Sequence, residues 1–180
     1  MKKPVIFTIG HSTHPIDEFV ELLQAYEIKE VVDVRSIPAS RHNPQFNSDT
    51  LKQSLQRVHI RYKLLKKLGG LRHAKKDSIN LGWHNTSFRG YADYMASPEF
   101  EEGLEVLTKI ARVRNTAIMC AEAVPWRCHR SLIADALTKK GWLVRDIMSR
   151  TSATKHRLTP FLKVKKGQFI YPTPGNIKLF

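Results

Sequence analysis

Short apolar runs of β-forming residues alternate with stretches that favour helix along this chain, and this alternation limits the possible folds more than any other feature. The apolar runs cover residues 4–9, 30–34, 60–65, 116–120 and 142–148, and helices are expected over 15–28, from about 48 to 58, over 91–113 and after 131. Strands that alternate with helices form a largely parallel sheet with helices on both faces. We therefore predict an α/β protein, a three-layer sandwich with a mostly parallel sheet of about five strands.

The length of 180 residues fits a single domain, which we expect to span residues 1–180. Its core is expected over about 4–150, and the basic tail of residues 151–180 is expected to pack on that core without a core of its own. Residues 72–89 lack clear periodicity and are predicted to form a long loop, which is usually a functional or mobile segment. Pro98 is suited to open a second helix within residues 91–113.

The net charge of +14 is unevenly distributed. The stretch from Thr50 to Lys76 and the stretch from Ser149 to Phe180 are rich in Lys and Arg and contain no acidic residue. Concentrated positive charge indicates a polyanionic partner, of which nucleic acid is the commonest, or a basic surface without a specific partner. Charge alone leaves both possibilities open.

The sequence predicts a cytoplasmic protein. Its N-terminal apolar run is too short for a secretory signal, and no stretch approaches the roughly 20 apolar residues that a membrane helix needs. The two cysteines, Cys120 and Cys128, do not form the disulfide framework of a small secreted domain. We expect no membrane partner, and the oligomeric state stays open.

In parallel α/β sheets the ligand site lies outside the carboxyl ends of the strands, and this rule selects candidate residues without any motif. The residues that follow the predicted strands are His11, Ser12 and Thr13; Asp33, Arg35 and Ser36; Gly69 and Gly70; and Cys120, Glu122, Arg127, Cys128, His129 and Arg130. We expect these side chains to converge.

The stretch from Ala117 to Ser131 passes from a buried strand through a compact loop to the start of a helix. Unpaired N–H groups and the positive end of the helix dipole favour anions at such a point. A cysteine there tends toward the thiolate, so Cys120 is a candidate nucleophile, although most cysteines at the end of a strand are simply buried apolar side chains. Glu122 and His11 are candidates for proton transfer; a buried ion pair and a turn are their alternative roles.

Arginine side chains bind phosphate oxygens through two parallel hydrogen bonds. The candidate anion- or substrate-binding residues are Arg35, Ser36, Arg41, Arg89, Tyr91, Arg127, His129 and Arg130, with Tyr91 as a face for stacking a base. The spacing of the Cys and His residues matches no standard zinc pair, so we assign no metal site, and no cofactor is identified.

The motifs TIGHST, VVDVRSIPASRHNPQF, LGG, FRGYADYM and CAEAVPWRCHRSLIADAL, followed by RLTPF, occur in this order from about residue 6 to 162. In this combination the chain resembles the domain of unknown function 488 family. The resemblance implies an α/β fold and a shared site but no reaction. The chain departs from the family at Asp146, where a histidine is usual, so no role at that position is carried over.

A more distant local likeness links the chain to rhodaneses and cysteine phosphatases. An early Asp-Val-Arg strand and a later strand, cysteine loop and Arg-Ser helix are similar to those enzymes, in which a thiolate lies in a loop of N–H groups. The likeness implies Cys120 as the thiolate and Arg127 or Arg130 as the group that holds the anion. The loop is longer here and includes Glu122 and Pro125.

Three functional hypotheses remain open, and whether the protein is an enzyme is one of the questions. The first is binding, with or without turnover, of a phosphate-bearing small molecule, nucleotide or nucleic acid at the Cys120–Ser131 loop. The second is a non-catalytic nucleic-acid-binding module that uses the two basic stretches. The third is a structural or partner-binding protein.

Overall fold

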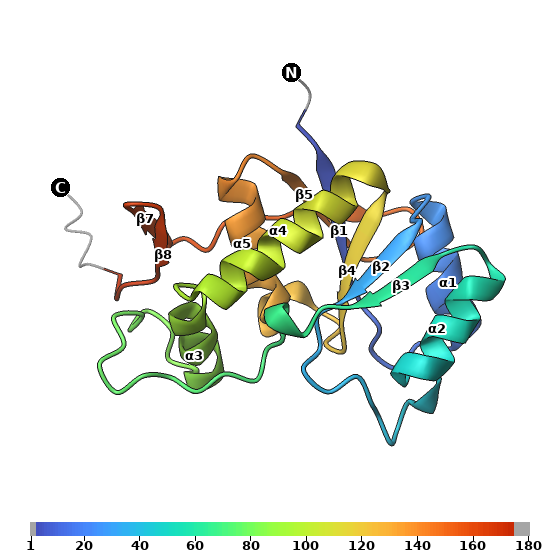
Figure 1. The fold of residues 1–180 in the computed structure, drawn as a ribbon, viewed down its shortest axis with the longest axis horizontal. Coiled ribbons are helices and arrows are strands. Elements are labelled where there is room, and N and C mark those ends of the chain that lie inside the picture. Colours follow the sequence, from blue (N-terminus) through green and yellow to red (C-terminus); the bar gives the residue numbers. More distant parts are fainter. Residues whose placement is uncertain (1–2, 175–180) are drawn as a thin grey trace.

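The computed structural model describes residues 3–174 and has the predicted α/β architecture (Figure 1). One six-stranded sheet contains β1 (Val5–Gly10), β2 (Glu30–Asp33), β3 (Arg61–Leu64), β4 (Thr116–Cys120), β5 (Leu143–Ile147) and β6 (Ala153–Lys155). The helices are α1 (Ile16–Ala25), α2 (Ser48–Arg57), α3 (Thr86–Tyr94), α4 (Pro98–Val113) and α5 (Arg130–Lys139). Three short 3₁₀ turns are η1 (Pro44–Phe46), η2 (Lys66–Leu68) and η3 (Pro125–Arg127).

The order of the strands places β4 and β1 side by side in the middle of the sheet, as β3-β2-β4-β1-β5-β6. The first five strands are parallel, and β6 runs antiparallel to β5. The connection from β1 passes β4 to reach β2, whereas the connection from β4 passes β1 to reach β5. Because these connections leave in opposite directions, a crevice is expected at the carboxyl ends of β1 and β4.

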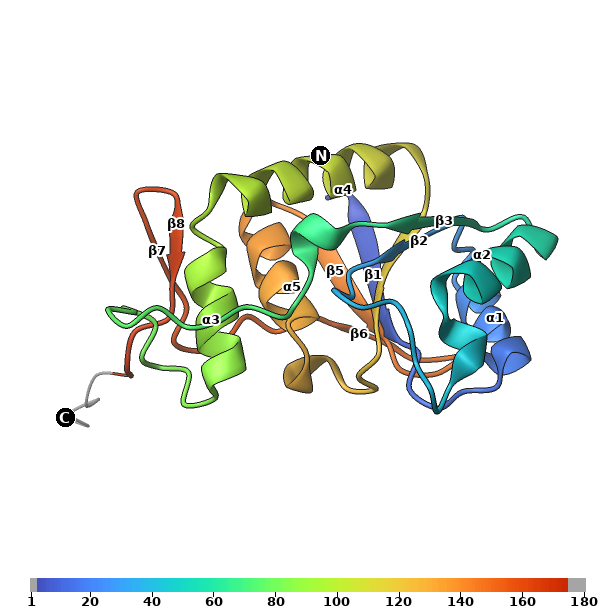
Figure 2. The same cartoon turned by 60° about the horizontal axis from the view of Figure 1, so that its bottom comes forward.

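Alternation of side chains along the strands builds a core on each face of the sheet. Ile9 and Met119 point to the face covered by α1 and α2, and Ile6 and Ile118 point to the face covered by α3, α4 and α5. Figure 2 shows the first pair of helices apart from α4 and α5, with the sheet between them. The three-layer prediction is confirmed.

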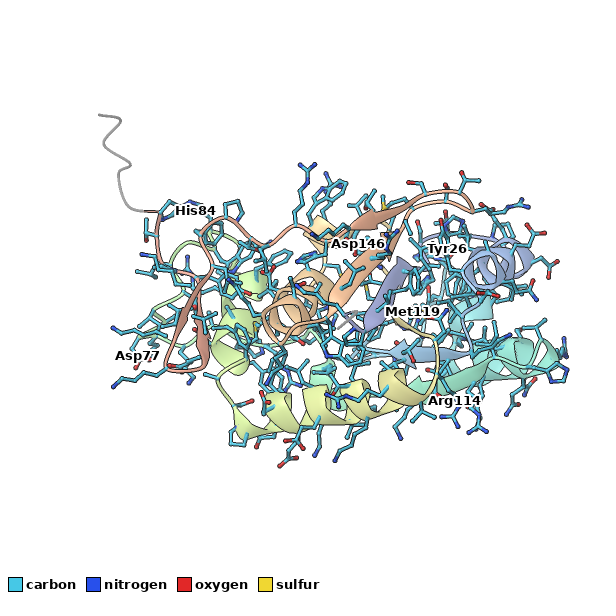
Figure 3. The ribbon with its side chains drawn as sticks, turned by 90° about the horizontal axis from the view of Figure 1, so that it is seen from above. Tyr26, Asp77, His84, Arg114, Met119 and Asp146 are labelled. Atoms are coloured by element: carbon cyan, nitrogen blue, oxygen red, sulfur yellow. The ribbon has the colours of Figure 1, made fainter. Side chains whose placement is uncertain are left out.

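Two helices, α3 and α4, occupy the region in which helix was predicted over residues 91–113. Ser97 caps α4 by accepting a hydrogen bond from the N–H of Phe100, and Pro98 occupies the first turn as predicted. α3 begins earlier than expected, at Thr86, where Asn85 accepts hydrogen bonds from the N–H groups of Ser87 and Phe88. The preceding loop carries Asp77 and His84 to the end of the molecule that bears the C-terminal hairpin (Figure 3).

Three short strands after residue 150 were not predicted. β6 extends the sheet beyond β5, and β7 (Lys163–Lys165) pairs with β8 (Gln168–Ile170) in a separate hairpin. These strands have three residues each and are mostly exposed, so they lack the apolar pattern of the inner strands. Phe169 and Tyr171 are nevertheless buried in the larger core cluster.

Candidate functional site

A cavity of about 340 Å³ opens where β2 and β4 end and α3 and α5 begin, and we call it the cysteine cavity. Six of the predicted site residues line it, namely Arg35, Ser36, Cys120, Glu122, Arg127 and His129. A second hollow of about 350 Å³ adjoins it, shares Arg35 and Glu122 with it, and is lined by His11. The fold therefore brings seven of the eleven predicted side chains to one continuous region.

Cys120 is 2% exposed and ends the central strand β4. Burial opposes ionisation of its thiol, but the hydrogen bond from the Cys128 thiol and the charge of Arg130 outweigh burial, so the pKa of Cys120 lies below its usual value. The same hydrogen bond and burial raise the pKa of Cys128 well above its usual value. The arrangement therefore favours a thiolate on Cys120 and a protonated Cys128.

Arg130 lies behind the wall of the cavity, at the start of α5, and is 1% exposed. Its Nη2 donates to the carbonyl of Ala123 at 2.9 Å, while Nε and Nη1 have no hydrogen-bond partner. None of the ion pairs formed by residues 3–174 involves this guanidinium. A buried cation without a carboxylate partner is costly and stabilises any negative charge nearby, here a thiolate on Cys120.

Arg130 fits beneath the loop because Gly10 has no side chain. A Cβ atom at Gly10 would lie 1.8 Å from the carbonyl oxygen of Glu122 and 2.8 Å from Nη1 of Arg130. The glycine of the TIGHS turn thus allows β1, the loop after β4 and Arg130 to lie close together.

His129 is held in one tautomer beside Cys128. Its Nε2 lies 2.9 Å from the carbonyl oxygen of Val34, which can only accept, so Nε2 carries the proton. Burial, together with the charge of Arg130, lowers the pKa of His129 to about 4, so the ring is neutral at pH 7. Its Nδ1 lies 3.5 Å from Sγ of Cys128.

Arg35 is buried but already paired. Its Nε and Nη2 donate to the carboxylate of Asp33, at 2.9 and 2.6 Å, and Nη2 also donates to the carbonyl of Phe46. Asp33 is fully buried and accepts a further bond from the hydroxyl of Tyr62. These contacts fix the carboxyl end of β2, and they neutralise the charge that Arg35 could offer to an anion.

His11 is neutral and engaged on both ring nitrogens. Burial lowers the pKa of His11 to about 4. Nη1 of Arg35, which can only donate, lies 3.2 Å from Nε2 of His11, so the proton resides on Nδ1, which lies 2.9 Å from the carbonyl oxygen of Ser12. Proton transfer at His11, as proposed from the sequence, therefore requires that the bond from Arg35 be broken.

The remaining lining residues differ in exposure. Glu122 and Arg127 are exposed, and both reach the cavity from the loop after β4. Ser36 accepts a hydrogen bond from the N–H of Leu71 at 3.1 Å, which ties the chain after η2 to the chain after β2. Gly70, which follows the third predicted strand, also lines the cavity. The N-terminal residues of α3, Ser87 and Phe88, complete the wall and were not among the predicted site residues.

Besides Arg130, three predicted residues, Tyr91, Arg89 and Arg41, line neither of the two hollows. The ring of Tyr91 is fully buried and its hydroxyl donates to the carbonyl of Leu68, so it offers no face for stacking a base. Arg89 turns away and donates from Nε and Nη2 to the carbonyl of Trp83. Arg41 is exposed in the loop after β2 and lines neither hollow.

The first basic stretch follows the exposed edge of the sheet. α2 and the edge strand β3 present Lys52, Arg57, Arg61 and Lys63 to solvent. β3 and β6 form opposite edges of the sheet, and β6 lies within the second basic stretch. The two stretches therefore do not form one patch along the sheet.

No group of three or more His, Cys, Asp or Glu side chains between residues 3 and 174 is arranged to hold a metal ion. In the same part of the chain, every helix is too short or too polar to cross a membrane. Asp146, the position at which the chain departs from the family pattern, accepts a hydrogen bond from the hydroxyl of Thr8 at 2.6 Å. It lies outside the cysteine cavity.

The comparisons with known proteins agree with the motifs. Comparison with curated proteins and with solved structures gave no match. The family model described as "Domain of unknown function DUF488" matches residues 15–137, from the residue before α1 to the last turn of α5. This match covers more than half of the chain and includes β2, β4 and the loop that carries Cys120, Glu122 and Arg127. The chain therefore belongs to the DUF488 family of domains of unknown function.

Proposed function

We propose that the cysteine cavity binds an anionic, phosphate-bearing ligand and that Cys120 acts on it as a thiolate nucleophile. The observation that supports this most strongly is the buried guanidinium of Arg130, which has no carboxylate partner and lies next to a cysteine whose pKa is lowered. A thiolate is the nucleophilic form of cysteine, and positive charge at a helix start favours it.

The surroundings of Cys120 suit an anion. Arg127 reaches the cavity from its rim, and α5 directs its positive end toward the loop. The N–H groups of Ala121 and Glu122 donate to no backbone carbonyl within the described residues, so they are free to bind a ligand oxygen. The hydroxyls of Ser36 and Ser87 also lie along the wall.

Glu122 is the better candidate for moving a proton during turnover. It is the only carboxylate among the cavity's lining residues, and it is exposed at the mouth of both hollows. His11, the other candidate, has both ring nitrogens engaged. Attack of the Cys120 thiolate on the phosphorus forms an S–P bond and breaks the P–O bond to the leaving group, whose oxygen takes up a proton. Glu122, in its protonated form, lies on the same loop and is placed to supply that proton.

The test is a titration of the Cys120 thiol, followed by the ultraviolet absorbance of the thiolate and by the rate of alkylation. We expect a pKa below the ordinary value of about 8.5. Arg130→Met should raise this pKa because the buried positive charge is lost, and Arg130→Lys should restore part of the effect. Cys128→Ala should also raise it because the hydrogen bond from its thiol disappears.

Inorganic phosphate serves as the ligand probe in the same titration. A phosphate bound beside the thiolate should raise the pKa of Cys120 further through repulsion of like charge. Arg127→Gln should abolish this response while leaving the phosphate-free pKa unchanged. An ordinary or elevated pKa for Cys120 in the folded wild type would refute the nucleophile, and a phosphate-independent pKa would refute the anion site.

A further inference from the structure

A second, larger cavity lies on the other side of the loop that follows β4. It measures about 650 Å³ and is bounded by η3, by β5 and β6, and by the segment 154–161 that continues from β6. Asp146, on β5, lies at its inner wall (Figure 3). We call it the aromatic cavity, and none of its lining residues lines the cysteine cavity.

Three aromatic side chains line this cavity, namely Trp83, Trp126 and Phe161. Trp126 is 65% exposed, an unusual state for so large an apolar side chain. Trp83 packs edge to face against Phe161 at 5.0 Å, and its buried indole N–H has no hydrogen-bond partner. An occupant with a flat apolar face would cover the exposed ring of Trp126.

The polar part of the cavity carries excess positive charge. Lys155 and Arg157 are exposed at its edge, and neither forms an ion pair within residues 3–174. The carboxylate of Asp146 is already engaged by Thr8 at 2.6 Å and lies 3.8 Å from His156. The two basic side chains are therefore available to an anionic group outside the protein.

We infer that the aromatic cavity binds a nucleotide unit, with the base stacked on Trp126 and the phosphate held by Lys155 and Arg157. A nucleotide fits this lining because its flat base can stack on an aromatic ring while its phosphate binds the neighbouring basic side chains. Proteins that bind single-stranded nucleic acid without sequence preference stack the bases on exposed aromatic rings beside basic residues. The segment that supplies both cations belongs to the acid-free stretch Ser149–Phe180. This site is separate from the cysteine cavity.

The experiment measures binding of AMP by calorimetry and of a short, labelled single-stranded oligoadenylate by fluorescence anisotropy. Trp126→Ala should weaken binding by about five- to 150-fold, the range given by stacking of one base, whereas Trp126→Phe should retain most of the affinity. Lys155→Gln with Arg157→Gln should weaken binding of the oligoadenylate and reduce its salt dependence by about one unit of slope.

The matched control is Lys109→Gln with Arg112→Gln, which removes the same charge from exposed positions on α4. This variant should bind as the wild type does. Equal losses in the control and in the Lys155–Arg157 variant would indicate general attraction by net charge and would overturn the site. Affinity unchanged by Trp126→Ala, or absence of binding to both probes, would overturn it as well.

The two probes identify the source of the nucleotide unit. Binding of AMP that competes with the oligoadenylate supports a free nucleotide, and binding of the oligoadenylate alone supports a strand. Cys120→Ser should leave both affinities unchanged, and Trp126→Ala should leave the pKa of Cys120 unchanged. Failure at the aromatic cavity is therefore distinguishable from failure of the function proposed for the cysteine cavity.

Discussion

Single residues that the sequence presented as independent candidates turn out to act as pairs. Arg35 is neutralised by Asp33, Cys120 is coupled to Cys128, and the ring nitrogen of His129 faces Cys128. Of the arginines grouped as anion ligands, only Arg127 has its side chain exposed at the cavity, while Arg130 acts from behind its wall. The role of each charged side chain therefore depends on how deeply it is buried and on which partner it contacts.

A pair of buried carboxylates around His156 had no signature in the sequence. Nε2 of His156 lies 2.8 Å from Asp135, and its Nδ1 lies 3.8 Å from Asp146. Burial alone would lower the pKa of this imidazole, but its hydrogen bond to Asp135 and the negative charges of Asp135 and Asp146 raise the pKa to about 9. The three residues are at least 10 positions apart along the chain, so only folding reveals that they belong together.

The raised pKa of His156 predicts how stability depends on pH. A folded-state pKa of about 9 against 6.5 unfolded stabilises the protein fully below pH 6.5, and this contribution is lost as pH rises to about 9. We expect the free energy of unfolding to fall by roughly 3 kcal/mol across this window. His11 and His129, whose pKa values are lowered to about 4, have the opposite effect: below pH 6.5 the free energy of unfolding falls as the pH is lowered. Stability should therefore be greatest near pH 6.5.

Denaturant unfolding of the wild type and of His156→Gln between pH 6 and 9 checks this expectation. The variant should lose the slope above pH 6.5, and His84→Gln, at an exposed position, should keep it. A slope that survives in His156→Gln would assign the pH dependence to another group.

At the scale of elements, the strands and their connections place the site. The parallel strands were predicted to within one residue at each end. The inner strands β2 and β4 are buried along their whole length, as expected for strands covered on both faces, whereas the edge strand β3 alternates between exposed and half-buried positions. β4 coincides with the predicted residues 116–120. α3 was missed at its start because its first residues are polar and its buried face includes Gly90, which lacks an apolar side chain.

Gly10 is the position where an element depends most on the absence of a side chain. Gly10→Ala would drive its Cβ against the carbonyl oxygen of Glu122, a backbone atom that cannot turn aside. We expect a loss of at least about 3 kcal/mol in the free energy of unfolding, because the loop over Arg130 must shift. Denaturant unfolding measures this loss.

The control for Gly10 is Gly103, in the middle of α4. A Cβ at Gly103 would approach the flexible end of Leu68 at 2.9 Å, and alanine favours helix over glycine by about 1 kcal/mol. Gly103→Ala should therefore change stability by less than about 1 kcal/mol. Similar effects of the two substitutions would show that the contact between Gly10 and Glu122 is not tight.

At the scale of the whole molecule, the C-terminal segment contributes side chains to the core and also packs over it. Tyr171 is fully buried, and its hydroxyl donates to Asp135 at 3.0 Å. Its ring packs near Trp83 and Phe161, at 5.6 and 6.2 Å between centroids. The chain after β6 therefore packs against the aromatic side chains of the aromatic cavity and against α5.

Substitution of Tyr171 tests this integration. Tyr171→Ala should cost about 3–5 kcal/mol in the free energy of unfolding, as expected for a large buried aromatic side chain. Tyr171→Phe should cost about 1–2 kcal/mol because Asp135 loses a donor. Val164→Ala, at an exposed position in β7, should be nearly neutral, and a Tyr171→Ala variant as stable as this control would show that the segment packs only loosely.

The sequence by itself determined the α/β class, the inner strands and the convergence of polar residues at their carboxyl ends. These features depend on local periodicity and on a rule of chain geometry that holds for any parallel sheet. The tertiary structure alone decided which charges are paired, which tyrosines are buried, that β6 joins the sheet, and that Phe169 and Tyr171 join the core. Such outcomes depend on contacts between residues far apart in the chain, whose energies of burial and pairing leave no local pattern to read.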